Sequence, residues 1–353
     1  MDIQNWVKPE VINQPAYRLK TVDFEIKMNQ NESPWDLPQT LKAEISDKIQ
    51  NTDWNHYPDL ISTKLKKKIA KLNGLKDDQI IVGKGSNEIF QAIFTATLSK
   101  GEEVCLLSPT FAVYQILAEH LEAKVINSTL NKSFEIDEND LLEKSKDAKL
   151  TILCNPNSPT GNLIKRDLIE SILQETRGLV IIDEAYYEFS GLTCSSLIDS
   201  YPNLLITRTF SKVFGLAAFR LGYGMMPTEF SNQIQKCMLP FNIDVPCAIA
   251  GELVLDHLDL FKSRADLIVM ERDRMIKSIN AIDGFLAQDS TANYFLMSGK
   301  IPPKELFTKI GSSGILIRDV SSYPGCDNYV RVSVGLPEEN LKLLKVLESL
   351  NEI

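Results

Sequence analysis

Short apolar runs recur between residues 80 and 226, and each of them is hydrophobic on both faces. They are IIVGKG (80–85), EVCLLSP (103–109), KLTILCNP (149–156), GLVIIDE (178–184), NLLITRTF (203–210) and a weaker run, LGYGMM (221–226). A strand that is apolar on both faces is typical of a sheet buried between two layers of helices. The pattern therefore predicts a central sheet built from these runs.

Helical patterns fill the gaps between the predicted strands. They are SNEIFQAIFTATLSKG (86–101), which Ser86 is expected to cap and Gly101 to end, TFAVYQILAEHL (110–121) and LIKRDLIESILQET (163–176). Strands that alternate with helices predict a mostly parallel sheet, and therefore an α/β fold class. Ligands of such sheets bind beyond the carboxyl ends of the strands, so we look for chemistry in the residues that follow each run.

The last part of the chain predicts a smaller α+β unit. A long amphipathic helix is expected over residues 257–281. Beyond it, strand and helix patterns alternate through ANYFLMSG (292–299), PPKELFTKIG (302–311), ILIRDV (315–320) and YVRVSVG (329–335), and a closing helix starts at 337. We therefore divide the chain into an N-terminal segment (1–30) that packs with the small unit and covers the site, a large domain (31–256) and a small domain (257–353).

Composition and charge exclude several classes of protein. The chain has 353 residues, of which 44% are apolar and 24% charged, as is usual for a soluble globular protein. Its net charge of −9 argues against general nucleic-acid binding. We find no apolar run of transmembrane length, no signal-peptide pattern and no CxxC pair among the six cysteines. These features predict a cytoplasmic protein with reduced cysteines, and the three isolated histidines make a metal site unexpected.

Polar residues suited to chemistry follow several of the predicted strands. GKGSNE (83–88) opens a helix, so its free backbone N–H groups predict an anion site. CNPNSPTG (154–161) places the amides of Asn155 and Asn157 in a rigid turn. Asp183 ends an apolar run, and a buried carboxylate needs a cation or several donors. Each feature alone is also compatible with an ordinary turn, cap or structural ion pair.

The segment TFSK ends with Lys212, directly after another predicted strand. A lysine at a strand end among apolar neighbours acquires a lowered pKa and reacts as a free amine; the alternative is an ordinary surface lysine. Ser211 and Arg220 add a hydroxyl donor and a fixed cation that suit a phosphate. An anion cradle, an amide, a buried acid, a reactive amine and an arginine form the set that a pyridoxal phosphate site requires.

These residues stand in a series of motifs that resembles the fold-type I pyridoxal-phosphate-dependent aminotransferases. The motifs are NES (31–33), YPD (57–59), GSNE (85–88), PTFAVY (109–114), NPNSPTG (155–161), DEAYYEF (183–189), TFSKVFGLAAFRLGYG (209–224) and YVRVSVG (329–335). They follow the family's order over nearly the whole chain, and the chain resembles the histidinol-phosphate aminotransferases most. The resemblance implies pyridoxal 5′-phosphate as the cofactor and a mostly parallel central sheet flanked by helices, with a smaller α+β domain.

The resemblance also implies a role for each residue around the cofactor ring. Lys212 would form a Schiff base with the cofactor and later move a proton between Cα and C4′. Asp183 would keep the ring nitrogen protonated, and Asn157 and Tyr186 would bond the 3′ oxygen of the ring. Phe111 would stack on the ring face, although a core aromatic residue at a helix start would look the same in the sequence.

A phosphate site and a second subunit are implied in the same way. The cofactor phosphate would bind the backbone of Ser86 and Asn87, the hydroxyl of Ser211 and the guanidinium of Arg220. Tyr57 matches a tyrosine that reaches this phosphate from the neighbouring subunit, so the resemblance implies a homodimer.

On the substrate side, Arg331 matches the arginine that grips an α-carboxylate with two hydrogen bonds; the alternative is a surface arginine on an edge strand. Arg318 matches a ligand of a substrate phosphate, and Tyr17 and Asn31 match residues that line the family's site. The expected partners are therefore a small amino donor and a 2-oxo acid, with no nucleic acid and no membrane.

The expected reaction is ping-pong amino transfer from L-histidinol phosphate to 2-oxoglutarate, in histidine biosynthesis. Two alternatives keep the fold: an aromatic-amino-acid transaminase, and a threonine-phosphate decarboxylase of cobalamin biosynthesis, which cleaves the Cα–COO⁻ bond. The non-catalytic alternative is a cofactor-binding regulator, which would need a nucleic-acid-binding extension that the sequence does not suggest.

Overall fold

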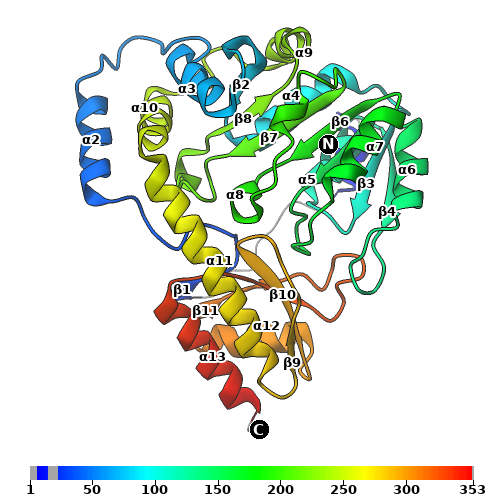
Figure 1. Ribbon diagram of the computed structural model, residues 1–353, viewed down its shortest axis with the longest axis vertical. Coiled ribbons are helices and arrows are strands. Elements are labelled where there is room, and N and C mark those ends of the chain that lie inside the picture. Colours follow the sequence, from blue (N-terminus) through cyan, green and yellow to red (C-terminus); the bar gives the residue numbers. More distant parts are fainter. Residues whose placement is uncertain (1–5, 15–22, 352–353) are drawn as a thin grey trace.

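The computed structural model describes residues 6–14 and 23–351. A large sheet with helices on both faces forms the upper part of the molecule in Figure 1, and a smaller group of strands and helices lies below it. The long helix α11 (Leu258–Asn280) runs from the upper part into the lower one. Over the described ranges, no helix is both long enough and apolar enough to span a membrane.

The larger sheet, counted over the described residues, has seven strands in the order β2-β8-β7-β6-β5-β3-β4. Their bounds are β2 (Ile80–Gly83), β3 (Glu103–Ser108), β4 (Lys124–Thr129), β5 (Leu150–Cys154), β6 (Leu179–Asp183), β7 (Leu204–Thr209) and β8 (Gly222–Met225). Strands β4, β3, β5, β6 and β7 are parallel, and β8 is antiparallel to both of its neighbours. The predicted α/β class with a mostly parallel sheet is confirmed, and the weak sixth run forms β8.

The sequence pattern does not predict β4. This strand lies at the edge of the sheet beside β3, and Ser128 is its one buried residue. An edge strand that faces solvent lacks the two-sided apolar pattern by which buried strands are found. The strand missed in this sheet is therefore its most exposed one.

Helices cover both faces of this sheet, because its strands turn alternate apolar side chains to each side. One face packs on α4 (Gly85–Thr97), α5 (Val113–His120) and α9 (Thr228–Ile234). The other face packs on α3 (Thr63–Asn73), α6 (Glu138–Lys146), α7 (Arg166–Glu175), α8 (Tyr187–Ser190) and α10 (Val245–Val254). Helix α2 (Gln39–Gln50) lies against α10. The sheet is thus enclosed, and its strand ends are the part open to ligands.

The start of the first predicted helix differs from the expected one. Helix α4 begins at Gly85 with Lys84 as its N-cap, so Ser86 lies inside the first turn and does not cap the helix. The helix ends at Thr97, before Gly101. The first N–H groups of a helix have no partner within it, so the amide of Ser86 is placed to bind a ligand at the helix end.

The lower part, within the described residues, holds a four-stranded sheet in the order β12-β13-β10-β9 and a two-stranded pair, β1-β11. Its elements are β9 (Phe285–Ala287), β10 (Tyr294–Gly299), α12 (Pro303–Ser312), β11 (Ile315–Leu316), β12 (Arg318–Asp319), β13 (Val330–Ser333) and α13 (Pro337–Asn351). The predicted strand ILIRDV is divided in two, because β11 pairs with β1 (Ile26–Lys27) and β12 pairs with β13.

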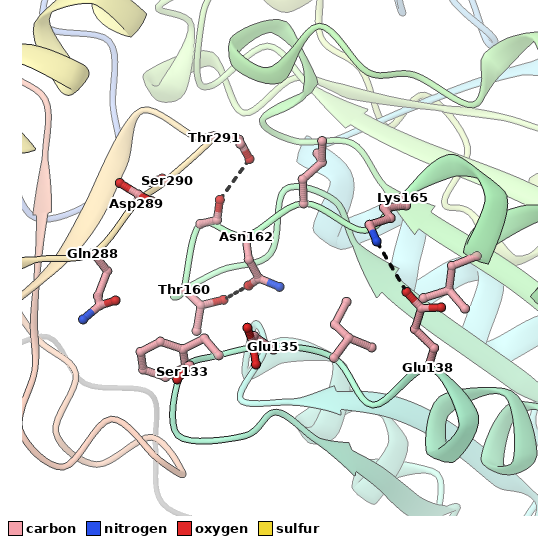
Figure 2. A pocket seen from close by; sticks show the side chains of 15 residues that line it. Ser133, Glu135, Glu138, Thr160, Asn162, Lys165, Gln288, Asp289, Ser290 and Thr291 are labelled. Carbon is pink, nitrogen blue, oxygen red and sulfur yellow. Dashed lines mark hydrogen bonds and ion pairs between the residues drawn. The ribbon is translucent and has the colours of Figure 1, made fainter.

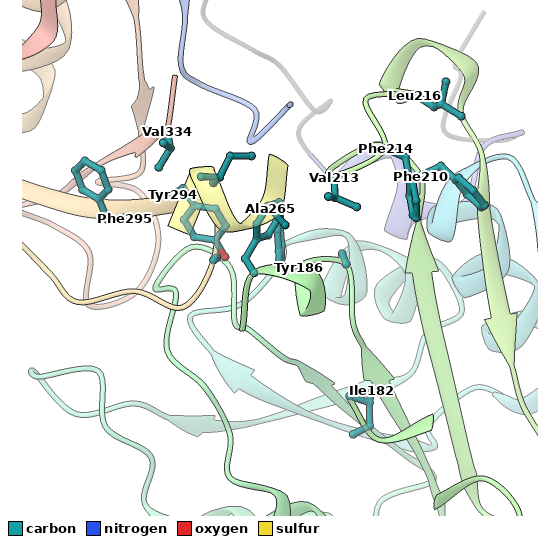
Figure 3. Packing of buried hydrophobic residues seen from close by; sticks show 14 of the residues in the cluster. Ile182, Tyr186, Phe210, Val213, Phe214, Leu216, Ala265, Tyr294, Phe295 and Val334 are labelled. Carbon is teal, nitrogen blue, oxygen red and sulfur yellow. The ribbon is translucent and has the colours of Figure 1, made fainter. Parts of the chain in front are cut away.

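The two parts of the molecule share one hydrophobic core. The ring of Tyr186, which follows β6, packs edge to face against the ring of Tyr294 on β10, with 5.0 Å between centroids. Ala265 of α11 belongs to the same cluster, as Figure 3 shows. Phe210 and Phe214, on either side of the TFSK lysine, are also part of it. The candidate residues therefore project from a close-packed interior.

The described N-terminal residues touch both parts of the molecule. Helix α1 (Pro9–Ile12) contacts α5, and Gln14 donates a hydrogen bond of 2.6 Å to Glu119. Strand β1, in contrast, pairs with β11 of the lower part. The domain boundaries expected at residues 30 and 256 stay a prediction.

Gly222 controls the approach of β8 to the start of α4. A Cβ atom at this position would lie 2.4 Å from the amide nitrogen of Ser86 and 3.0 Å from the carbonyl oxygen of Arg208. Because these are backbone atoms, they cannot turn aside. We expect Gly222→Ala to lower the free energy of unfolding, measured by urea denaturation, by about 1–3 kcal/mol, as overpacking does.

Gly224→Ala is the matched control on the same strand. Its Cβ atom would meet only side-chain atoms, at 3.0 Å and beyond, and these can adjust. A loss for Gly224→Ala as large as that for Gly222→Ala would contradict the role of the backbone contact.

Candidate active site

A cavity of about 600 Å³ opens at the carboxyl ends of the parallel strands. Most of the residues singled out in the sequence line it: Asn31, Ser86, Asn87, Phe111, Asp183, Tyr186, Ser211, Lys212, Arg220, Arg318 and Arg331. They come from the first turn of α4, the end of β6 and the segments after β1, β3, β6 and β7, and from the β12–β13 pair. The fold therefore brings residues that are distant in the sequence to one place, and their individual roles stay predictions.

Lys212 follows the end of β7 and is half-buried. Its Nζ atom donates a hydrogen bond of 3.0 Å to the carbonyl oxygen of Gln30, and it lies 5.3 Å from the ring centre of Tyr186. Burial, together with the positive charge of Arg331, lowers the pKa of the Lys212 amine to about 8. An appreciable share of the amine is therefore neutral and nucleophilic near neutral pH.

Asp183 is the last residue of β6 and is 3% exposed. Burial raises the pKa of its carboxyl group to about 6, against the effect of its hydrogen-bond donors. The hydroxyl of Tyr114 donates to Oδ2 over 2.5 Å, and the Thr207 hydroxyl and the Ala185 amide each donate to Oδ1 over 3.2 Å. These donors are neutral, so the carboxylate is poised to accept a cationic ligand group.

A positively charged corner lies at the start of α4. Arg220 has a left-handed backbone, with φ of 53°, and its Nη1 atom donates to the Ala217 carbonyl over 3.1 Å and to the Ser211 hydroxyl over 3.4 Å. A Cβ atom on Gly85 would lie 3.0 Å from Arg220 Nη2, so the guanidinium sits directly against the helix end. A helix N-terminus beside an arginine and a serine is a strong anion site.

Asn157 is wholly buried beside the cavity and does not line it. Its Nδ2 atom donates to the Pro109 carbonyl over 2.9 Å and to the Thr160 hydroxyl over 2.7 Å, and its Oδ1 accepts from the Thr110 hydroxyl over 2.8 Å. Both amide hydrogens are thus used within the protein in this arrangement. A bond from Asn157 to a ligand would require one of them to be exchanged.

Tyr186 and Asn31 form a pair on the cavity wall. Asn31 Nδ2 donates to the Tyr186 hydroxyl over 3.0 Å, and the Asn31 side-chain oxygen accepts a hydrogen bond of 2.9 Å from Ser333 on β13. Burial raises the pKa of Tyr186 to about 12, so this phenol stays neutral and can donate its proton to a ligand oxygen.

Two arginines face the cavity from the smaller sheet. Arg318 on β12 and Arg331 on β13 are directly opposite each other in the antiparallel register. Arg331 donates from Nη2 to the Asn29 carbonyl over 2.9 Å and from Nη1 to the Ser158 hydroxyl over 3.3 Å. Its Nε atom is buried and has no hydrogen-bond partner among the described residues. Two like charges at one register position favour the binding of anions between them.

Among the predicted residues that the structure describes, Tyr57 lies away from the cavity. Tyr57 is 82% exposed and stacks on Phe241 with ring centroids 4.6 Å apart, outside the cavity of its own chain. Tyr17 lies outside the described residues. Over the described ranges, no group of three or more His, Cys, Asp or Glu side chains is arranged to hold a metal ion.

A separate cavity of about 610 Å³ lies between the loop after β5 and the turn at residues 288–291, and Figure 2 shows its side chains. None of the predicted site residues lines it, and its lysine, Lys165, is 3.8 Å from Glu138. The two walls meet where Gly161 accepts hydrogen bonds of 2.8 and 2.9 Å from the backbone and hydroxyl of Thr291. A Cβ atom on Gly161 would lie 2.2 Å from Ser290 Oγ.

The sequence matches the family described as aminotransferase class I and II over residues 25–347. The chain belongs to this family. A histidinol-phosphate aminotransferase from Chlorobaculum tepidum is 35% identical to it over 93% of this chain and 95% of the relative.

Solved structures agree with this assignment. The histidinol-phosphate aminotransferase from Clostridium acetobutylicum superposes with a TM-score of 0.86 at 28% identity, over 93% of this aminotransferase and 99% of that chain. L-threonine-O-3-phosphate decarboxylase from Porphyromonas gingivalis superposes with a TM-score of 0.81 at 24% identity, over 93% of this chain and 100% of that one. The second likeness shows the shared fold alone.

Family membership makes this chain a pyridoxal-phosphate-dependent aminotransferase, and the cavity fits that cofactor. The α4 end with Arg220 suits a phosphate, and the buried Asp183 carboxylate suits a protonated ring nitrogen. Lys212 supplies an amine with a lowered pKa in the same cavity. Phe111 lines the same cavity and offers an aromatic ring to a planar ligand.

Tyr114 is the site residue that sequence reasoning missed. It belongs to the motif PTFAVY, but a tyrosine in an amphipathic helix reads as a core residue. Its hydrogen bond to Asp183 joins residues far apart in the sequence, so no local pattern reveals it. The signal that was present is its position one helical turn after Phe111.

The lowered pKa of Lys212 makes a testable prediction. In the full-length protein freed of cofactor, we expect the rate at which Lys212 captures pyridoxal phosphate to rise with pH up to about 8 and then to level off, because the neutral amine is the nucleophile. The adduct is trapped with borohydride after short incubations and quantified on the Lys212 peptide by mass spectrometry.

Nα-acetyl-lysine is the reference, since its amine has an ordinary pKa of about 10.4. A capture rate for the protein that keeps climbing to pH 10, in parallel with the reference, would contradict the lowered pKa.

Proposed function

We propose that this aminotransferase transfers the amino group of L-histidinol phosphate to 2-oxoglutarate, giving imidazole-acetol phosphate and L-glutamate in histidine biosynthesis, as a cytoplasmic enzyme. The opposition of Arg318 and Arg331 across one cavity wall carries this proposal. The two substrates bind in turn and carry different anions, a phosphate on the donor and an α-carboxylate on the acceptor. Relatives named for this reaction, 32–35% identical over nearly the whole chain, support it.

The two arginines take different anions in this proposal. Histidinol phosphate has no α-carboxylate, so Arg331 serves glutamate and 2-oxoglutarate. Its buried Nε atom has no hydrogen-bond partner in the part of the chain that the structure describes, and it is available for one bond of a bidentate grip on a carboxylate. Arg318 lies directly opposite on β12 and meets the phosphate of the donor.

The reaction needs a base close to the α-carbon and an electron sink beside it. Pyridoxal phosphate supplies the sink when it is bound, since its protonated ring stabilises the carbanion left by the α-proton. Lys212 Nζ would take that proton and return it to the C4′ carbon, and its lowered pKa suits both steps. Asp183 holds the proton on the ring nitrogen.

The remaining cavity residues hold the cofactor in place. The backbone of Ser86 and Asn87, the Ser211 hydroxyl and the Arg220 guanidinium bind its phosphate, as their position around the start of α4 suggests. Phe111 stacks on its ring.

Tyr186 bonds the 3′ oxygen of the cofactor, and Asn31 supports the Tyr186 hydroxyl. Asn157 bonds the same oxygen once it releases one of its present acceptors. Tyr17 is proposed to line the substrate side of the cavity.

The enzyme is proposed to act as a homodimer. Tyr57 cannot serve the cavity of its own chain in the position described, because it is 82% exposed and packs on Phe241. Exposed apolar side chains stand close to it in the sequence, with Trp54, Leu60 and Ile61 all more than two-fifths exposed. A surface of this kind marks a protein–protein contact, and from it Tyr57 reaches the cofactor phosphate of the partner subunit.

The choice of substrate is tested by the visible absorbance of the bound cofactor. We expect L-histidinol phosphate to convert that absorbance at lower concentration than phenylalanine does, with glutamate active as the second donor. Threonine phosphate should release no carbon dioxide. Preferential conversion by phenylalanine would instead support the aromatic transaminase, and carbon dioxide release from threonine phosphate would support the decarboxylase.

Two variants distinguish the proposed roles of the two arginines. We expect Arg331→Gln to raise the KM for glutamate about 10- to 100-fold, because a hydrogen-bonded charge pair is lost, and to leave the KM for histidinol phosphate nearly unchanged. Arg318→Gln should lower kcat/KM for histidinol phosphate by a similar factor.

Unphosphorylated L-histidinol is the control substrate. We expect Arg318→Gln to leave kcat/KM for this slow substrate unchanged. Equal losses with L-histidinol and L-histidinol phosphate would show that Arg318 does not read the phosphate.

A further inference from the structure

Tyr114 stands at the junction of two groups that act on the cofactor in the proposed function. We infer that it is a positioning residue: its hydroxyl orients the Asp183 carboxylate toward the ring nitrogen, and its ring holds Phe111 against the ring face. This inference rests on the proposed roles of Asp183 and Phe111, and it adds a residue that does not line the cavity.

The hydrogen bonds of Asp183 are unequal. Tyr114 donates to Oδ2 over 2.5 Å, whereas the two donors to Oδ1, Thr207 and Ala185, are 3.2 Å away. A carboxylate has about four acceptor positions, so the donors among the described residues fill three of them and leave room for one ligand donor. The short bond from Tyr114 fixes the torsion of the carboxylate and so decides where the remaining position points.

The hydroxyl of Tyr114 is itself held in place. The side chain is completely buried in the first turn of α5, and its ring centroid is 5.0 Å from that of Phe90 on α4. Its other neighbour is Phe111, edge to face at 5.5 Å, and the Tyr114 amide donates to the Phe111 carbonyl over 3.2 Å. A movement of Tyr114 would therefore displace both Phe111 and Asp183.

Charge explains why this position needs a donor. Burial raises the pKa of Asp183, and the hydrogen bond from Tyr114 is the largest opposing contribution. A protonated carboxyl group cannot act as the anionic partner of a ring nitrogen. Without the hydroxyl, the pKa of Asp183 rises further above its ordinary value. On acidification, the carboxylate is then protonated at a higher pH than in the unaltered protein.

Four other titratable side chains face Asp183 among the described residues: Tyr114, Cys154, Tyr186 and Lys212. Cys154 on β5 and Tyr186 after β6 have pKa values raised by burial, as does Tyr114 itself, so all three stay neutral below pH 8. Lys212 has a pKa lowered to about 8 and is largely protonated below pH 7. Between pH 5 and pH 7, therefore, Asp183 is the member of this group whose charge changes most.

The test uses the full-length protein, freed of cofactor and titrated with pyridoxal phosphate from pH 5 to pH 7. We expect Tyr114→Phe to weaken cofactor binding about 10-fold, as loss of a hydrogen bond to a charged group does. Cofactor binding should weaken as the pH falls, and we expect the pH at which this acid limb begins to be about one unit higher in Tyr114→Phe than in the unaltered protein. Thr207→Val, which removes the 3.2 Å bond and keeps Tyr114, should move the limb less.

A second comparison separates positioning from packing. In an Asp183→Asn background the carboxylate is absent, so adding Tyr114→Phe should change cofactor binding by less than twofold. The circular dichroism of the bound cofactor should change in Tyr114→Phe and stay unchanged in Thr207→Val. The inference is overturned by an unmoved acid limb, by an equal loss in the Asp183→Asn background, or by a Tyr114→Phe chain that no longer folds.

Discussion

A carboxylate removed from water keeps its charge only when donors surround it or a cation joins it, and the architecture of this protein is arranged around one such group. Asp183 ends β6 between Cys154 of β5 and Thr207 of β7 in the sheet register. All of its observed donors are neutral, so the full compensation has to come from a ligand. The enclosed parallel sheet makes this possible, because it holds the carboxylate rigidly while leaving its strand ends accessible.

Arginine side chains line the same cavity as Asp183. Arg331 and Arg220 both push the Lys212 pKa down, Asp183 pulls it up, and burial outweighs the rest. The cavity therefore brings a buried acid, an amine with a lowered pKa and several arginines to one place. A phosphorylated, cationic heterocycle together with an anionic substrate complements these groups, which is why the separate parts fit one class of chemistry.

The sequence predicted those features that depend on local pattern. Runs that are apolar on both faces predicted the buried strands. The polar residues that follow these runs predicted the position of the cavity, because parallel strands end at the same edge of the sheet. It could not predict β4, whose side chains face solvent, or the N-cap of α4, where Lys84 precedes the expected Ser86. Nor could it show that Tyr114 bonds Asp183, or that Arg318 lies opposite Arg331, since both facts depend on register between distant elements.

The contact between Gly161 and the 288–291 turn constrains how this chain can diverge over evolutionary time. A side chain at position 161 would have to tolerate a φ of +79° and also displace the Ser290 hydroxyl group, which its Cβ would approach within 2.2 Å. Replacing Ser290 with alanine would not remove the steric obstacle, because the Cβ atom of residue 290 would still lie 2.8 Å away. Position 161 is therefore constrained both by its own backbone conformation and by a neighbour that lies far downstream in the sequence.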